Sequence, residues 1–207
     1  MALAIAVTAL CVSGCGGGDS SGREPTSSAR HADGEGPLSA SLSGGGGGGS
    51  LSAPGQVPWS GTFGSALLCS HGGDEITVQD IRYLSRVNPL AATPMIRNVP
   101  AKAERTPRGD WAPIAARVGI PGDFASAPHQ ARGELSTQVK GLTVSQPCGQ
   151  RSSVPYIELL TVLKAGRAGA WVDGIDIDYT TASGSYTLAV DWNYVLCGSR
   201  TQDADVC

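Results

Sequence analysis

Residues 170–197 constrain the fold most, because their apolar side chains repeat with a period of two. Apolar and polar residues alternate from 175 to 180, and from 186 to 196 every second residue is large and apolar. The turn-forming residues 181–184 separate the two runs. This pattern predicts a β-hairpin with one face in a core and one face in water. A lone hairpin is only marginally stable in water, so other strands must cover its apolar face.

Further short runs of β-forming residues precede this hairpin, and Gly, Pro and Ser turns separate them. We therefore predict an all-β fold, an immunoglobulin-like β-sandwich of about seven strands. Besides the hairpin, the expected strands lie at residues 63–69, 75–85, 94–99, 134–143 and 154–164, and a short helix is considered at 114–118.

The chain has six cysteines, of which four lie in the body of the sequence. These four are widely spaced and lack the close pairs that zinc sites usually present, so they predict two disulfides formed in an oxidising compartment. Three pairings are open, and we favour Cys69 with Cys148 and Cys197 with Cys207. The second bridge would hold the last residue of the sequence against the fold.

The N-terminus begins with an apolar run over residues 2–12, too short to cross a bilayer and typical of the core of a signal peptide. Val12, Ser13, Gly14 and Cys15 follow. These four residues resemble the lipobox of bacterial lipoproteins, which has an aliphatic residue, two small residues and a cysteine. The resemblance implies that residues 1–14 are a signal peptide and that Cys15 becomes the lipidated N-terminus, anchored at the outer face of the bacterial cell membrane.

Residues 15–53 differ in composition, with many Gly and Ser and six consecutive glycines at 44–49. Such a segment buries little apolar area, so we predict a flexible tether between the lipid and the folded part. The β-sandwich domain is expected over residues 54–207.

The folded part also resembles uncharacterised cell-envelope lipoproteins of actinobacteria. The resemblance rests on the segments Leu68-Cys69, ITVQDIRYL, YIELLTVLK, GIDIDYTTASGSYTL and Val195-Leu196-Cys197. It implies a location and a fold, and it carries no catalytic signature.

Asp173, Asp176 and Asp178 are the main candidate metal ligands, because carboxylates on one face of a strand offer the hard oxygens that calcium prefers. The alternative is that they are the water-facing positions of an alternating strand, and no EF-hand spacing is present. We therefore expect no metal and no other cofactor.

The charges are segregated along the chain. Residues 82–117 hold seven basic and two acidic residues, a net charge of +5, whereas residues 173–207 hold one basic and six acidic residues, a net charge of −5. Either the two regions face each other, or each is a patch for a partner. In the second case Arg97, Arg105 and Arg108 would bind an envelope protein or an anionic polymer. The overall net charge of −3 argues against a nucleic-acid partner.

The sequence thus predicts a lipid-anchored envelope protein whose sandwich is non-catalytic and has a binding or structural role. One alternative is an envelope hydrolase using His71 or His129, although no nucleophile motif accompanies these residues. The other alternative is a module that binds a small ligand or calcium.

Overall fold

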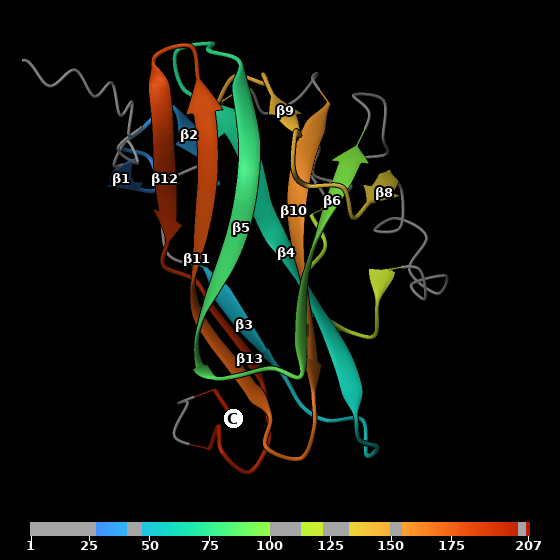
Figure 1. Ribbon diagram of the computed structural model, residues 1–207. Helices are drawn as coiled ribbons and strands as arrows, with labels where there is room; N and C mark the ends of the chain where they lie inside the picture. The colour runs from blue at the N-terminus through green and yellow to red at the C-terminus, as the bar shows by residue number, and fades with distance from the viewer. Residues whose placement is uncertain (1–27, 41–46, 100–112, 122–132, 150–154, 203–205) are drawn as a thin grey trace, which may run out of the picture.

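The computed structural model describes residues 28–40, 47–99, 113–121, 133–149, 155–202 and 206–207. In this part of the chain two β-sheets pack face to face, and no α-helix occurs (Figure 1). The described residues therefore include no helix long and apolar enough to cross a membrane. The fold is an all-β sandwich, as predicted, with thirteen described strands in place of the expected seven or so.

The first sheet has seven strands and is built around β11 (Ala170–Thr181). Along one side β11 pairs with β5 (Ile76–Val87), and β9 (Thr143–Val144) extends the sheet beyond it. Along the other side β11 pairs first with β12 (Gly184–Val190) and then with β13 (Asn193–Leu196). All these pairings are antiparallel.

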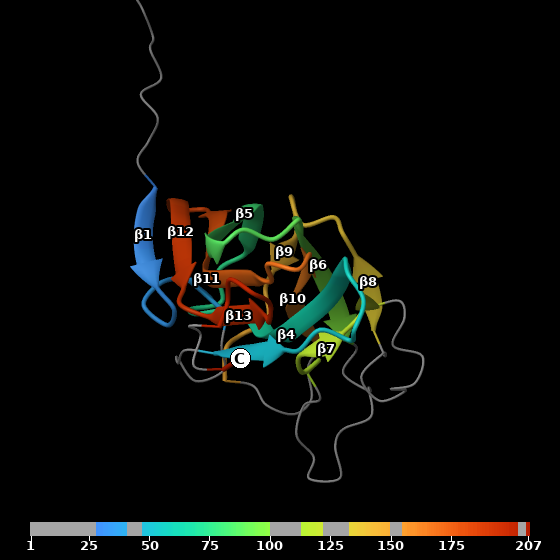
Figure 2. The same ribbon diagram turned by 90° about the horizontal axis from the view of Figure 1, so that it is seen from below.

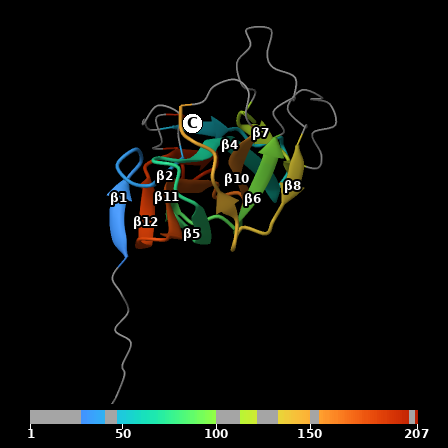
Figure 3. The same ribbon diagram turned by 90° about the horizontal axis from the view of Figure 1, so that it is seen from above.

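The second sheet has six strands, with β10 (Tyr156–Ala165) between β4 (Trp59–Ser70) and β6 (Ala91–Val99). Three short strands complete it. These are β2 (Leu38–Ser39) and β7 (Arg117–Val118), which pair with β4, and β8 (Glu134–Ser136), which pairs with β6. The views from below and above place β8 on the side of the sandwich opposite to β1 (Figures 2 and 3).

The predicted hairpin is confirmed. Thr181 at the end of β11 pairs with Gly184 at the start of β12. Ile175, Ile177 and Tyr179 are at most 1% exposed, because they face the second sheet and form the core with residues of β4, β5 and β10. The second alternating run is interrupted near Trp192, which separates β12 from β13 although the period-two burial continues through the break.

The N-terminal segment differs from the prediction. Within the expected tether at 15–53, β1 (Ala29–Ala32) pairs in parallel with β12, and β3 (Gly48–Leu51) pairs in parallel with β13. Both strands therefore line the same edge of the seven-stranded sheet, where β1 lies beside β12 (Figure 2). A domain start at Pro54 is wrong, since the sandwich includes the described residues before it; residues 15–27 and 41–46 lie outside the described part.

Two properties explain why this segment forms strands despite its composition. Edge strands are stabilised by backbone hydrogen bonds, and a few apolar side chains, such as the fully buried Leu38, add anchorage. The glycines permit close approach: a Cβ at Gly47 would lie 2.8 Å from the indole of Trp192, and one at Gly48 would lie 2.4 Å from the carbonyl oxygen of Asn193. Part of the glycine run is thus required by packing.

Two smaller expectations also fail. The short helix considered at 114–118 is absent, because residues 117–118 form β7 against β4. The single strand expected at 134–143 is divided into β8, in one sheet, and β9, in the other. This segment therefore crosses from one sheet to the other.

Candidate functional site

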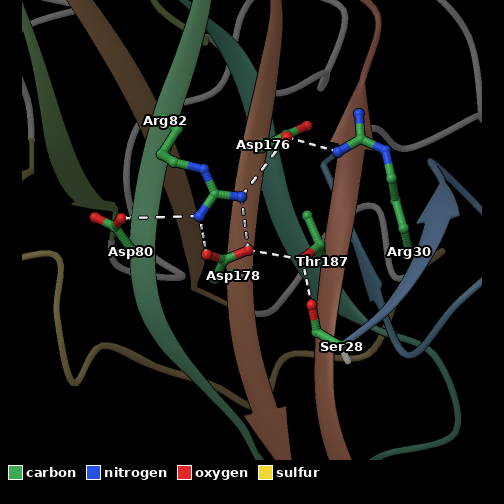
Figure 4. Close-up of polar contacts among 7 residues, drawn as sticks. All are labelled: Ser28, Arg30, Asp80, Arg82, Asp176, Asp178 and Thr187. Atoms are coloured by element: carbon green, nitrogen blue, oxygen red, sulfur yellow. Dashed lines mark hydrogen bonds and ion pairs between the residues drawn. The ribbon is translucent and has the colours of Figure 1, made fainter. Parts of the chain in front are cut away.

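The outer face of the seven-stranded sheet carries the densest group of interacting charges among the described residues. Asp176 and Asp178 alternate with the buried isoleucines of β11, so their side chains lie on the face away from the core. Arg82 from the adjacent strand β5 pairs with both aspartates, and Arg30 from β1, which lies beyond β12, pairs with Asp176. Asp80 from β5 lies 4.0 Å from Arg82 (Figure 4). We call these five residues the charged face.

Arg82 lies at the centre of the charged face. Its Nη2 donates to Oδ1 of Asp178 at 3.1 Å, its Nη1 bonds the other carboxylate oxygen, and Nη2 lies 3.6 Å from Oδ2 of Asp176. Arg30 donates from Nη1 to that same Asp176 oxygen at 2.6 Å. Arg30 therefore joins β1, a strand from the expected tether, to the central strand of the sheet.

Asp178 is held in its ionised form by this geometry. Partial burial alone would raise the pKa of its carboxyl group, but hydrogen bonds from Arg82 and Thr187 outweigh that effect and lower the pKa. The Thr187 hydroxyl donates to Oδ1 at 2.7 Å and also contacts the hydroxyl of Ser28 at 3.1 Å. These contacts connect β11, β12 and the start of β1 (Figure 4).

A second pair continues the pattern further along the sheet. Arg86 donates from Nε to Oδ2 of Asp173 at 2.7 Å, and its guanidinium carbon lies 4.6 Å from the ring centroid of Trp171. The indole Nε1 of Trp171 in turn donates to Asn193 at 3.0 Å. Stacking of this kind favours an arginine, because its planar cation interacts with an aromatic face.

These pairs favour one of the two interpretations of the segregated charges. Arg82 and Arg86 belong to the basic region, Asp173, Asp176 and Asp178 to the acidic one, and the fold brings them together because β5 and β11 are antiparallel neighbours. In these pairs the opposite charges offset each other. Each of the three aspartates pairs with an arginine. No group of three or more side chains that could hold a metal ion occurs among the described residues.

Arg97, predicted as a partner-binding residue, is buried, and a surface role for it is wrong. The residue is only 1% exposed, and its side chain pairs with Glu158, itself fully buried on β10. Nε and Nη2 of Arg97 lie 2.6 and 2.5 Å from Oε2 of Glu158, and Nη2 also donates to the hydroxyl of Tyr156 at 3.0 Å. Arg97 is available to no external partner in this fold.

Glu158 organises the backbone around it. Its Oε1 accepts hydrogen bonds from the backbone N–H groups of Ser65 and Ile114, both at 2.8 Å. Ser65 has a left-handed backbone conformation, with φ of 76°, in the irregular part of β4 opposite Leu160. Sequence reasoning missed this role, although a single acid between Ile157 and Leu159 in a largely apolar strand indicates a buried charge that needs a partner.

The other predicted site residues are placed as follows. Arg105, Arg108, His129 and Cys15 lie outside the described residues. His71 is exposed in the turn after β4. His31, which falls in the expected tether, lies against the core, and its Nε2 is 2.5 Å from the hydroxyl of Tyr179.

The four body cysteines form two disulfides, Cys69 to Cys148 and Cys197 to Cys207, the pairing favoured from the sequence. The first bridge joins the end of β4 to the segment after β9, and the second joins the end of β13 to the last residue. Two disulfides are compatible with an extracytoplasmic location.

Among the cavities on the described surface, one of about 480 Å³ lies where β6 ends and β8 and β10 begin. Its lining includes Asn98, Glu134, Gln146 and Tyr156. Burial raises the pKa of Tyr156 to about 12, even though Arg97 acts against this rise. Another, of about 260 Å³, lies beside Phe63, Trp192 and Tyr194.

In comparisons with known proteins, the chain matches no family model, and no curated protein and no solved structure shows significant similarity to it.

Proposed function

We propose that the protein is a lipid-anchored, extracytoplasmic envelope protein, and that its β-sandwich has a non-catalytic binding or structural role. The observation that carries the anchor is the lipobox-like sequence Val12-Ser13-Gly14-Cys15 directly after an apolar run. The observation that supports the compartment is the use of all four body cysteines in disulfides.

The use of the cysteines agrees with this assignment. Six cysteines minus the four in disulfides leaves Cys11 and Cys15. In the proposed maturation Cys11 is removed with residues 1–14, and the thiol of Cys15 becomes the thioether that carries the lipid. No body cysteine then remains free to be oxidised further in the envelope.

The described strands limit how far an anchored sandwich stands from the bilayer. Ser28, directly before β1, is thirteen residues after Cys15. A fully extended chain of this length spans at most about 45 Å. We therefore expect the edge formed by β1 and β12 to stay close to the membrane surface, while the rest of the sandwich can extend further outward.

The proposed binding partner of the sandwich is an envelope protein or an anionic envelope polymer. Of the three arginines first considered, Arg97 is excluded by burial, so this proposal rests on Arg105 and Arg108, which the described part does not include. A non-catalytic role is supported by the acidic side chains described above. Asp173, Asp178 and Glu158 each contact an arginine, which is typical of structural ion pairs.

The anchor is tested by metabolic labelling with a radioactive fatty acid in a bacterial host that expresses the full chain. The wild type is expected to incorporate label and to fractionate with membranes, and Cys15→Ser is expected to lose both properties. Cys11→Ser is the matched control, because it removes the neighbouring thiol and should retain the label. Equal labelling of the wild type and Cys15→Ser would contradict the proposed anchor.

A further inference from the structure

The lower end of the sandwich is built from loops that are far apart in the sequence (Figure 1). Three loops meet there, over residues 88–90, 166–169 and 198–201. Backbone hydrogen bonds hold them together: the N–H of Leu90 donates to the carbonyl oxygen of Lys164, just before the second loop, at 2.8 Å, and the N–H of Ser199 donates to that of Arg167 at 3.0 Å. The side chains of these loops are therefore presented at one end of the molecule, which Figure 2 views directly.

Close packing fixes the second and third loops. Gly169 has a left-handed backbone conformation, with φ of 81°, and a Cβ at Gly198 would lie 2.2 Å from the backbone nitrogen of Gly169. Thr201 is fully buried, and its hydroxyl accepts a hydrogen bond from the N–H of Gly198 at 2.8 Å. The disulfide between Cys197 and Cys207 closes the same segment. A fixed backbone reduces the entropy that is lost when these loops bind a partner.

Three basic side chains lie at this end, Lys164, Arg167 and Arg200, and all three are exposed. None of them forms an ion pair with an acidic side chain in the described part of the chain. By contrast, four arginines elsewhere in the fold each contact a carboxylate: Arg30, Arg82, Arg86 and Arg97. We call Lys164, Arg167 and Arg200 the basic end. Its three positive charges are available to an external partner.

The opposite end of the sandwich is the one nearer to the proposed lipid anchor. The first described strand, β1, begins opposite Tyr186, two residues after the start of β12, and so lies near the hairpin turn. The turn between β4 and β5, with Asp74 and Glu75, lies at the same end (Figure 1). The twelve residues of β11 place the basic end about 40 Å from these turns. In the anchored protein we therefore expect the basic end to face away from the membrane.

The basic end suits a partner with many negative charges. Arginine presents a planar fork of donors that fits phosphate oxygens, and lysine binds phosphate as a point charge. One exposed contact of this kind contributes little, but three on one fixed surface can engage successive charges of one chain. Asp203 and Asp205, which follow Arg200 in the segment closed by the disulfide, lie outside the described residues and lower the net charge of that segment.

We propose that the basic end binds an anionic, phosphate-bearing envelope polymer on the side of the sandwich that faces away from the membrane. The three cations contact successive phosphates of the polymer, and the loops that carry them keep their conformation. This inference rests on the proposed function: it keeps the anionic polymer as the partner and assigns it to Lys164, Arg167 and Arg200 in place of Arg105 and Arg108.

The test is binding of fluorescently labelled polyphosphate to the purified full chain, followed by fluorescence anisotropy. The wild type is expected to bind, and its affinity should fall as salt is added, because the contacts are exposed. The triple variant Lys164→Ser, Arg167→Ser and Arg200→Ser should bind about tenfold more weakly. Its Tm should be unchanged, since none of the three side chains has an ion pair to lose within the described part of the chain. Equal binding by the wild type and the triple variant, or no binding by the wild type, would overturn the proposal.

Further variants locate the contact. Lys140→Ser removes an exposed lysine near the start of β5, at the opposite end, and should leave the affinity unchanged. Asp203→Asn with Asp205→Asn removes two negative charges from the segment that carries Arg200 and should strengthen binding. A loss of affinity on Lys140→Ser, or only on Arg105→Ser with Arg108→Ser, would place the polymer elsewhere and refute the assignment to the basic end, while polymer binding itself would stand.

The full chain with Cys15→Ser separates a polymer from a lipid surface, because it lacks the proposed lipid and keeps the basic end. It should bind polyphosphate as the wild type does, and it should not sediment with vesicles of phosphatidylglycerol. Tighter binding to the vesicles than to polyphosphate would make the basic end a membrane contact and overturn the proposal. Fatty-acid labelling is read separately, so failure here is distinguishable from failure of the anchor.

Discussion

Replacement of Arg97 by methionine would remove one half of a buried ion pair and leave Glu158 without its counter-charge. Both residues are at most 1% exposed, and Oε2 of Glu158 receives two nitrogens of Arg97 at 2.6 and 2.5 Å. Truncation of one partner of such a pair typically costs about 3 to 5 kcal/mol, because the remaining charge stays buried without compensation. We expect Arg97→Met to lose this much unfolding free energy at pH 7.

The loss should depend on pH. Burial raises the pKa of Glu158, and Arg97 and the two backbone N–H groups offset part of that rise. A raised pKa means that the folded state binds the proton more tightly than the unfolded chain. The contribution of Glu158 to stability is therefore greatest below its ordinary pKa and declines as the pH rises through the folded value. Without Arg97 the pKa rises further, so the variant should regain up to about 1.4 kcal/mol per pH unit as the pH falls from 7 towards 5.

The assay is urea-induced unfolding of the full chain at pH 5, 6 and 7. The double variant Arg97→Met with Glu158→Gln is the control, since the glutamine is neutral and its amide oxygen can still accept the N–H groups of Ser65 and Ile114. The double variant should be more stable than Arg97→Met at pH 7 and nearly independent of pH. If both variants lose the same stability at all three pH values, the reasoning about an uncompensated buried charge is refuted.

Three further predictions concern the bridges, the glycine run and the charged face. Cys69→Ser opens a loop with a sequence separation of 79 and should cost about 4 to 5 kcal/mol, against about 3 kcal/mol for Cys207→Ser with a separation of 10, by denaturant unfolding. Gly48→Ala, whose Cβ would meet a carbonyl oxygen at 2.4 Å, should cost about 1 to 3 kcal/mol, and Gly49→Ala, with its nearest neighbour at 3.4 Å, should cost less than that; equal tolerance in a thermal scan would argue against β3. Arg82→Met should cost below about 1 kcal/mol, and less at high salt, because the arginine is 48% exposed.

The hairpin and the core could be predicted because few structures other than a strand with one buried face produce a period of two over many residues. Ile175 and Ile177 are buried in the core where the alternation places them, and Asp176 and Asp178 lie on the opposite face of the same strand, where Asp176 is only 7% exposed. The pairing of the cysteines agreed as well, since a nearby cysteine offered the simplest partner for Cys207.

The tether could not be judged from composition, because edge strands depend on backbone hydrogen bonds, which composition does not report. Gly47 and Gly48 look like linker residues, yet they lie where a Cβ has no room against Trp192 and Asn193. The sequence did contain one signal, the apolar residue Leu38 between polar stretches. In the structure Leu38 is fully buried.

The charged side chains required the three-dimensional pairing. The sequence around Arg82 and Arg97 does not distinguish their environments. Arg82 lies on the outer face of β5, whereas Arg97 is buried beside Glu158. The burial of Arg97 follows from the register of β6 against β10, which places Arg97 opposite Glu158. No local pattern carries that register.

The central claim is that Cys15 is the lipidated N-terminus of a mature envelope protein. Mass spectrometry of the N-terminal peptide, isolated from the membrane fraction of a bacterial host, tests it most directly. We expect a peptide that begins at Cys15 and carries the mass of a diacylglyceryl group on its thiol. A peptide that runs from Gly14 through an unmodified Cys15 into Gly16, from protein recovered in the soluble fraction, would contradict the account.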